Sequence, residues 1–405
     1  MTVRHRPKRE AAAELDLAAR LADASVVICA GAGGVGKTTV AATVGLGLAA
    51  TGRRVAVVTI DPARRLAEAL GLPELGNEPQ PVEPALLESS GLELRGELHA
   101  MMLDVKRTFD ELIELLAPAA ETARAILANP VYRQLSTAVA GSQEYTAMAK
   151  LFELERSGAF DAIVLDTPPS RNAIDFLEAP DRLLAFLEGR AAAGLLGPTG
   201  HAARAAGIVF AAIRRITGVA LLDDLTTFFR LVAELLSGFH ERAAAVRELL
   251  ADPATAFLIV TSPERGPVEE AIYFAQRLDR GGLHSRGLIL NRFHAGSEDT
   301  RDAAVTAARL APALGTELAA KVGRSAAEFE QLARRDRLAM RRLADALDEP
   351  APFRLSDREA DVHDISALVE LHRELFGDRR EPSPERPEAG GREPVDAKAR
   401  SHGHP

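Results

Sequence analysis

Residues 31–38 read Gly-Ala-Gly-Gly-Val-Gly-Lys-Thr, and the rest of the chain is best understood outward from them. A short β-branched run at 25–30 precedes this stretch and is typical of a buried parallel strand. An apolar helical pattern at 38–49 follows it. A glycine-rich turn between a strand and a helix is the form of a phosphate-binding loop, in which main-chain N–H groups and a helix N-terminus face one anion. The sequence therefore predicts a nucleoside triphosphate site.

Two side chains of this loop have specific expected roles. Lys37 is expected to reach the β- and γ-phosphates, and the hydroxyl of Thr38 is expected to ligate Mg²⁺. The alternative is a chance glycine-rich turn, which the complete match and the flanking strand and helix disfavour. The predicted nucleotide-binding residues of the loop are Gly31, Ala32, Gly33, Gly34, Val35, Gly36, Lys37, Thr38 and Thr39.

Composition limits the function classes. The chain has 405 residues, enough for one large α/β domain with an insertion or for two domains. A net charge of −9 argues against a broad nucleic-acid surface. The single cysteine, Cys29, lies inside the first predicted strand, so we expect a small core residue and no disulfide framework. The basic N-terminus lacks an apolar signal-peptide core, which predicts a cytoplasmic protein.

Strand and helix patterns alternate along most of the chain. This alternation predicts a doubly wound, mostly parallel sheet with helices on both faces. The predicted strands are 25–30, 54–60, 97–104, 161–166, 256–261 and 286–291.

Several segments lie outside this alternation. We expect an N-terminal arm at 1–22, an ATPase core at 23–377, and a disordered Pro-, Glu- and Arg-rich tail at 378–405. Gaps at about 105–160 and 171–250 are almost wholly helical in pattern and predict a helical subdomain inserted in the core. A charged helical pattern at 326–346 is most simply a solvated face.

Three further strand ends carry polar residues, and ligands of doubly wound sheets lie beyond the carboxyl ends of strands. Asp61 could orient a water for attack on the γ-phosphate, or it could simply cap a turn. Asp166 closes an apolar strand, as in a Walker B motif, and would hold Mg²⁺ directly or through water. Asn291 offers a donor and an acceptor suited to adenine, but a turn-forming role is the more common one.

The loop and these three strand ends, in this order, resemble the ArsA family of ATPases in the MinD-like group of P-loop NTPases. That family's loop reads GKGGVGKT, and residues 31–38 match it except at Ala32. The resemblance covers about residues 24–377. It implies a P-loop core with inserted helices, ATP and Mg²⁺ as cofactors, and hydrolysis of ATP. It also implies a dimer, formed with itself or with a paralogous ATPase.

The resemblance assigns further residues to the site. The family's DPAH segment falls on 61–64, with Arg64 in place of histidine, and its aspartate positions the attacking water. Its DTAPTGHT switch falls on 166–173. The switch residues assigned in this way are Asp61, Pro62, Ala63, Arg64, Asp166, Thr167, Pro168, Pro169 and Arg171. The adenine contacts assigned in this way are Asn291 with Arg292, and Pro352 with Phe353 closing over the base.

The departures from the family pattern limit what the resemblance implies. The family's second loop residue is a lysine that reaches across the dimer to the partner's phosphates, and here it is Ala32. We therefore expect slow hydrolysis in a homodimer, or a partner chain that supplies the charge. Arg64, Arg65 or Arg171 could also substitute. Arsenite transport is disfavoured because the metalloid is bound by thiolates and Cys29 lies inside a strand.

Two other functions stay open. A nucleotide-gated scaffold subunit of a heterodimer, with little turnover, would also explain Ala32. A targeting factor would bind a client helix at the helical subdomain and associate peripherally with a membrane protein. Residues 205–222 are apolar enough for such a groove, although Arg214 and Arg215 oppose membrane spanning and a buried helix pair is the simpler interpretation.

Overall fold

The computed structural model describes residues 16–60, 64–135, 142–167, 178, 219–296, 303–347, 352–358, 362 and 364–377. Its centre is an eight-stranded sheet with strand order β3-β4-β2-β5-β1-β6-β7-β8. All neighbouring strands are parallel except β3, which pairs antiparallel with β4. The strands are β1 (Val26–Ala30), β2 (Arg54–Thr59), β3 (Gln80–Pro81), β4 (Glu97–Met102), β5 (Ala162–Asp166), β6 (Thr255–Thr261), β7 (Ser285–Phe293) and β8 (Phe353–Ser356).

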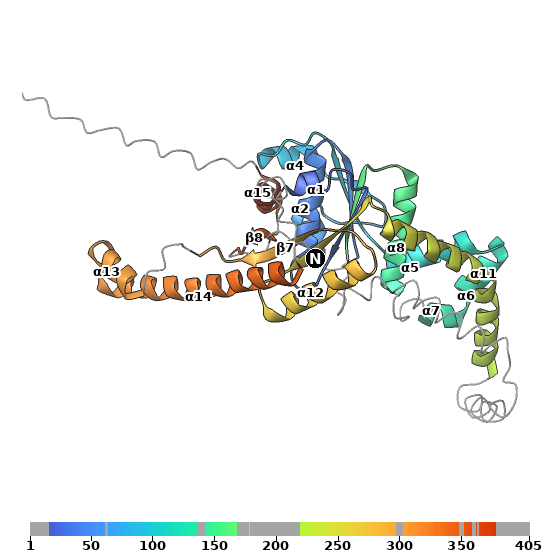
Figure 1. The fold of residues 1–405 in the computed structure, drawn as a ribbon. Helices are drawn as coiled ribbons and strands as arrows, with labels where there is room; N and C mark the ends of the chain where they lie inside the picture. Colours follow the sequence, from blue (N-terminus) through green and yellow to red (C-terminus); the bar gives the residue numbers. More distant parts are fainter. Residues whose placement is uncertain are drawn as a thin grey trace, which may run out of the picture.

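Helices cover both faces of this sheet, as the sequence predicts for a doubly wound fold (Figure 1). One face is packed by α1 (Leu17–Arg20), α2 (Lys37–Ala50), α3 (Arg65–Ala69), α4 (Pro84–Ser89) and α15 (Ile365–Phe376). The other face is packed by α8 (Ser142–Ser157), α12 (Arg265–Arg280) and the ends of α11 (Val219–Ala251) and α14 (Thr316–Leu347). Central strands such as β1 are buried along their whole length, because helices lie on both sides of them.

A third hydrophobic cluster lies beside the sheet. It joins α8 and α11 to α5 (Val105–Leu116), α6 (Ala120–Ala128) and α7 (Pro130–Leu135). Stacked or tilted rings of Phe109, Tyr132 and Phe239 form its centre. These helices correspond to the predicted helical gap at 105–160 and to the end of the one at 171–250. The segments 1–15, 205–218 and 378–405, for which we predicted an arm, an apolar helix and a tail, lie outside the described residues.

Two strands were not expected from the sequence. β3 has only two residues, and β8 has four, so neither gives a readable alternation. β8 extends the sheet beyond β7, and its Phe353 and Leu355 are buried in the core face that α15 covers. Among the described residues, every helix is too short or too polar to cross a bilayer.

On the far side of the sheet from the α5–α7 helices, α13 (Ala303–Leu314) and α14 form a hairpin that extends away from the body (Figure 1). The charged part of α14 is not wholly a solvated face, so that interpretation was wrong for one residue. Asp336 is fully buried and accepts hydrogen bonds from the main-chain N–H of His294 at 2.9 Å and from Arg335 Nε at 2.9 Å. Its Oδ2 also lies 2.7 Å from His294 Nδ1. The helical periodicity of the sequence cannot reveal that Asp336 is buried, because its hydrogen-bond partner His294 lies in the chain that leaves β7.

Replacing Asp336 by alanine is expected to lower the free energy of unfolding by about 3 kcal/mol. The substitution leaves the half-buried N–H of His294 without its acceptor and removes a hydrogen bond between the residue that follows β7 and α14. Urea denaturation of the full chain measures the loss. Asp345→Ala, at an exposed position of the same helix, is the matched control and should change stability by less than about 0.5 kcal/mol. Equal stability of the two variants would contradict a stabilising role for the buried carboxylate of Asp336.

Candidate functional site: the loop at the carboxyl edge of the sheet

The loop 31–36 leaves β1 at the carboxyl edge of the sheet and leads directly into α2. Gly34 (φ 80°) and Gly36 (φ 91°) have left-handed backbone conformations that side chains disfavour, and Gly36 caps the N-terminus of α2. A Cβ on Gly33 or Gly34 would meet no atom within 4 Å, so the loop has open space in front of it. The geometry is that of an anion cradle at a helix N-terminus.

Neighbouring strands hold the loop tightly from behind. A Cβ on Gly31 would lie 2.0 Å from the main-chain oxygen of Val260 in β6, which leaves room for glycine alone. A Cβ on Gly36 would lie 2.3 Å from Asn291 Nδ2 at the end of β7. The same amide nitrogen of Asn291 donates a 2.8 Å hydrogen bond to the main-chain oxygen of Val35. The glycines therefore serve close packing as well as turning.

The predicted phosphate-binding lysine lies over the loop. Lys37 is 7% exposed, and its Nζ donates to the main-chain oxygens of Gly31 and Ala32, each at 3.0 Å. These bonds hold the ammonium group above the space that the loop encloses. Ala32 is buried, and its side chain adds no charge there.

The predicted metal-binding pair is brought together by the fold. Thr38 is 128 residues from Asp166, and its hydroxyl donates to Asp166 Oδ2 at 2.6 Å. Thr59, at the end of β2, donates to the same oxygen at 2.8 Å. Thr59 and Cys29 pair in register with Asp166 from the two strands that flank β5, so all three lie at one level of the sheet. Oxygen ligands of this kind suit Mg²⁺.

Thr59 is a site residue that sequence reasoning missed. Its hydroxyl is buried, and it precedes Asp61 by two residues along the chain. The signal was present, since a polar residue ends an otherwise apolar strand two positions before the predicted switch. That signal cannot reveal which strand lies beside β2.

The segment after Asp166 begins with a second fixed contact. The N–H and the hydroxyl of Thr167 both donate to the main-chain oxygen of Cys29, at 3.3 and 2.9 Å. Burial, followed by the charge of Asp166, raises the pKa of the Cys29 thiol far above its ordinary value. Cys29 is therefore a neutral core residue. The predicted switch residues that follow Thr167, which are Pro168, Pro169 and Arg171, lie outside the described residues.

The first predicted switch is described at one residue only. Asp61, Pro62 and Ala63 lie outside the described residues. Arg64 follows them with a left-handed backbone (φ 57°) and lies 3.8 Å from Glu74 in an exposed ion pair. Such pairs contribute little to stability, so Arg64 is available for other contacts.

The residues assigned to adenine lie on neighbouring strands, since Phe353 in β8 pairs with Ile289 in β7, two residues before Asn291. Asn291 contacts the loop, and Arg292 follows it with a left-handed backbone (φ 58°). Phe353 instead lies in the core, 9% exposed, with its ring against Gly287 and 5.4 Å below the guanidinium of Arg20. Its position at the start of β8 explains the difference from the expected lid, because a strand residue facing a helix is buried. Pro352 is buried beside it.

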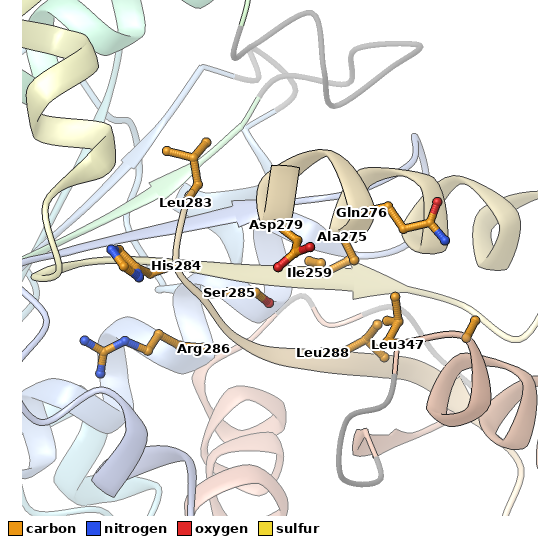
Figure 2. Close-up of a pocket in the computed structure, with 11 residues that line it drawn as sticks. Ile259, Ala275, Gln276, Asp279, Leu283, His284, Ser285, Arg286, Leu288 and Leu347 are labelled. Carbon is orange, nitrogen blue, oxygen red and sulfur yellow. The ribbon is translucent and has the colours of Figure 1, made fainter. Parts of the chain in front are cut away.

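Two cavities lie away from the loop. One, of about 580 Å³, lies along β8 and α15 and includes Pro352, Phe353 and Phe376 in its lining. The other, of about 400 Å³, lies between α12, the amino end of β7 and the end of α14, and Asp279 and Ser285 are among the residues that line it (Figure 2). Within the described ranges, no group of three or more His, Cys, Asp or Glu side chains could hold a metal ion.

The fold and the loop together define the class of the protein, which has the doubly wound α/β fold of P-loop NTPases. The family model described as anion-transporting ATPase matches residues 24–311. The chain belongs to this ArsA ATPase family.

Individual relatives are distant. The chain is 28% identical over 256 residues to a protein of Aquifex aeolicus named for an arsenical pump-driving ATPase, covering 61% of this chain and 57% of that one. It is 27% identical to the arsenical pump-driving ATPase of Escherichia coli, over 70% of this chain and 42% of that one. It is 30% identical to ATPase GET3 of Malassezia globosa, over 39% of this chain and 43% of that one. The chain thus spans about half the length of the curated relatives that it matches.

Replacing Thr59 by valine is expected to lower both the affinity for Mg²⁺ in the presence of ATP and the rate of hydrolysis by about tenfold. Valine keeps the shape of the side chain but removes one of the two hydroxyls that orient Asp166 Oδ2. Titration calorimetry with Mg²⁺ measures the affinity. Thr43→Val is the control, because Thr43 is equally buried and its hydroxyl bonds only within α2, to the main-chain oxygen of Thr39. Unchanged Mg²⁺ affinity in Thr59→Val would argue against a positioning role.

Proposed function

We propose that this chain binds ATP together with Mg²⁺ and hydrolyses it to ADP and phosphate. The observation that carries the proposal is the convergence of Thr38 and Asp166 beside an open glycine loop with Lys37 above it. Two segments supply these groups at one edge of the sheet, and Thr38 in the first is 128 residues from Asp166 in the second. A structural role for the cluster would not need an open cradle in front of the loop.

The roles follow from the positions. The N–H groups of 33–38 and the ammonium of Lys37 bind the phosphates, and Thr38 and Asp166 hold the metal. Bound Mg²⁺ neutralises charge on the phosphates. Asp61 orients the attacking water, and the switch segments after Thr59 and Asp166 respond to the γ-phosphate. Asn291 and Arg292 lie near the end of β7, where Asn291 contacts the loop and where the base would bind.

A dimer, with itself or with a paralogous ATPase, is part of the proposal, and the nucleotide state would switch it and its helical subdomain. The uncharged Ala32 favours a second candidate function, the nucleotide-gated subunit of a heterodimer with little turnover of its own. A client protein at the helical subdomain is a further proposal. Of the described residues of α5–α7, Leu115 is the large apolar side chain that is most exposed.

Phosphate release separates the two candidates. The purified chain is assayed with Mg²⁺ and ATP, alone and with a paralogous ATPase, beside an Ala32→Lys variant. Measurable turnover by the chain alone supports the enzyme, and turnover that appears only with the paralogue supports the gated subunit. Ala32→Lys should raise the rate of the homodimer by about tenfold or more, because it restores a cation to the partner's site. Failure of calorimetry to detect ATP binding would refute both candidates.

A further inference from the structure

Exposed apolar side chains gather on the α13–α14 hairpin. Ten large hydrophobic residues of the described chain are exposed, and seven of them lie on this hairpin. They are Val305, Leu314, Leu318, Val322, Phe329, Leu332 and Leu338. Figure 1 shows the hairpin extending away from the sheet, so its outer part has little of the body beside it. A concentration of this kind on a projecting element marks an interaction surface.

Most of these residues on α14 form one seam. The seam consists of Leu318, Val322, Ser325, Phe329 and Leu332, whose spacing alternates between four and three residues. This is the spacing of a coiled coil, in which Val322 and Phe329 occupy a positions and the other three residues occupy d positions. The same spacing continues toward the body as Asp336, Ala339 and Leu343, which are buried against it. One face of α14 is therefore packed in its second half and open in its first half.

The first helix of the hairpin does not fill the seam. α13 packs on the adjacent face of α14, where Ala319 and Gly323 are buried. A Cβ on Gly323 would lie 2.5 Å from the main-chain oxygen of Ala303, so the two helices touch closely there. In contrast, Leu318 is 50% exposed and Phe329 is 46% exposed. The ring of Phe329 lies in a T-shaped arrangement with that of His294, at 5.5 Å between ring centroids.

We propose that this seam pairs, antiparallel, with the same seam of a second copy of this chain. In an antiparallel pair, each a residue packs beside a d residue of the other helix. The a residues Val322 and Phe329 then lie opposite Ser325 and Leu318 of the second copy, in a single register. The two-fold axis passes between residues 323 and 324, as closed symmetry requires.

The charges beside the seam agree with this register. The g positions of the heptads hold Lys321 and Glu328. In an antiparallel coiled coil, g residues face g residues, so this register sets Lys321 opposite Glu328 of the second copy, twice by symmetry. A parallel pair would set g against e, and the e positions hold Ala319, Ala326 and Ala333, which offer no charge. In the single chain, Lys321 lies 3.0 Å from Glu317 in an exposed ion pair that contributes little and can exchange.

The seam is short, so the association should be weak. Residues 318–332 span about 21 Å of helix at the usual rise per residue. An interface of this length belongs to the small class that forms a concentration-dependent dimer. It involves no residue of the loop, so it is independent of ATP binding and of the dimer proposed above.

Sedimentation velocity of the full chain without nucleotide, over a series of concentrations, tests the proposal. The wild type should dimerise as concentration rises. Lys321→Glu and Glu328→Lys should each raise the dimer dissociation constant by about tenfold, because each sets like charges together. The double variant Lys321→Glu/Glu328→Lys should return it to the wild-type value. Such rescue is expected only if each copy supplies both charges.

An apolar control completes the test. Leu318→Glu should abolish the association, while Leu338→Glu, on the same helix, 65% exposed and off the seam, should leave it unchanged. Circular dichroism verifies that each variant is folded. A wild type that stays monomeric at the highest concentration, or a double charge variant that remains as weak as the single ones, would overturn the proposal. Neither of these two outcomes depends on ATP binding, so a failure of the proposed ATP-dependent function would be distinguishable from a failure of this proposal.

Discussion

Replacing Lys37 by alanine is expected to lower the rate of ATP hydrolysis by about a thousandfold. The ammonium group is held over the loop by the main-chain oxygens of Gly31 and Ala32, and the Lys37 residue is only 7% exposed. A fixed charge in such a place stabilises the developing negative charge far better than a solvated one does. Single-turnover phosphate release measures the effect, and calorimetry measures the accompanying loss of ATP affinity.

The matched control for this prediction is Lys150→Ala. Lys150 is also buried, but it lies in α8 and pairs with Glu153 at 2.9 Å, away from the loop. That variant should hydrolyse ATP at close to the wild-type rate while folded. A Lys37→Ala protein that kept more than about a tenth of the wild-type rate would show that the loop does not act through this ammonium.

Replacing Gly31 by alanine is expected to lower the free energy of unfolding by about 3 kcal/mol. A Cβ at this position would lie 2.0 Å from the main-chain oxygen of Val260, and a central strand such as β6 cannot move without disturbing its neighbours on both sides. The loop or the strand must therefore shift. Urea denaturation, followed by circular dichroism, gives the size of the loss.

Gly33→Ala is the control, because a Cβ there would meet nothing within 4 Å. The two substitutions are chemically identical and two residues apart, so a difference between them reports the contact with β6 alone. Gly33→Ala should unfold within about 0.5 kcal/mol of the wild type. If Gly31→Ala were equally stable, the close approach of the loop to Val260 would have to be wrong.

The strands that position the loop were predictable, because each is a buried apolar run of ordinary length. The predicted strands at 25–30, 54–60 and 161–166 agree with β1, β2 and β5 to within one residue at each end. Beyond these, β8 was missed since four residues carry no periodic signal. The lid role of Phe353 was assigned from the resemblance, and the structure places this residue in a strand, 9% exposed.

Charge patterns were less reliable than apolar ones. A carboxylate on a charged helix is normally solvated, but Asp336 is buried where the chain leaving β7 brings His294 against it. The switch residues Asp61 and Arg171 remain predictions, since they lie outside the described residues.

The order of residues alone determined that this protein has a glycine loop between a strand and a helix, and a carboxylate at the end of a later strand. Those features are local, and local geometry follows from the chain's own backbone preferences. Tertiary structure alone decided that Thr59 shares an oxygen of Asp166 with Thr38, and that half of one face of α14 is left open. Both depend on which strands and helices become neighbours, and this arrangement is determined by the packing of the whole hydrophobic core.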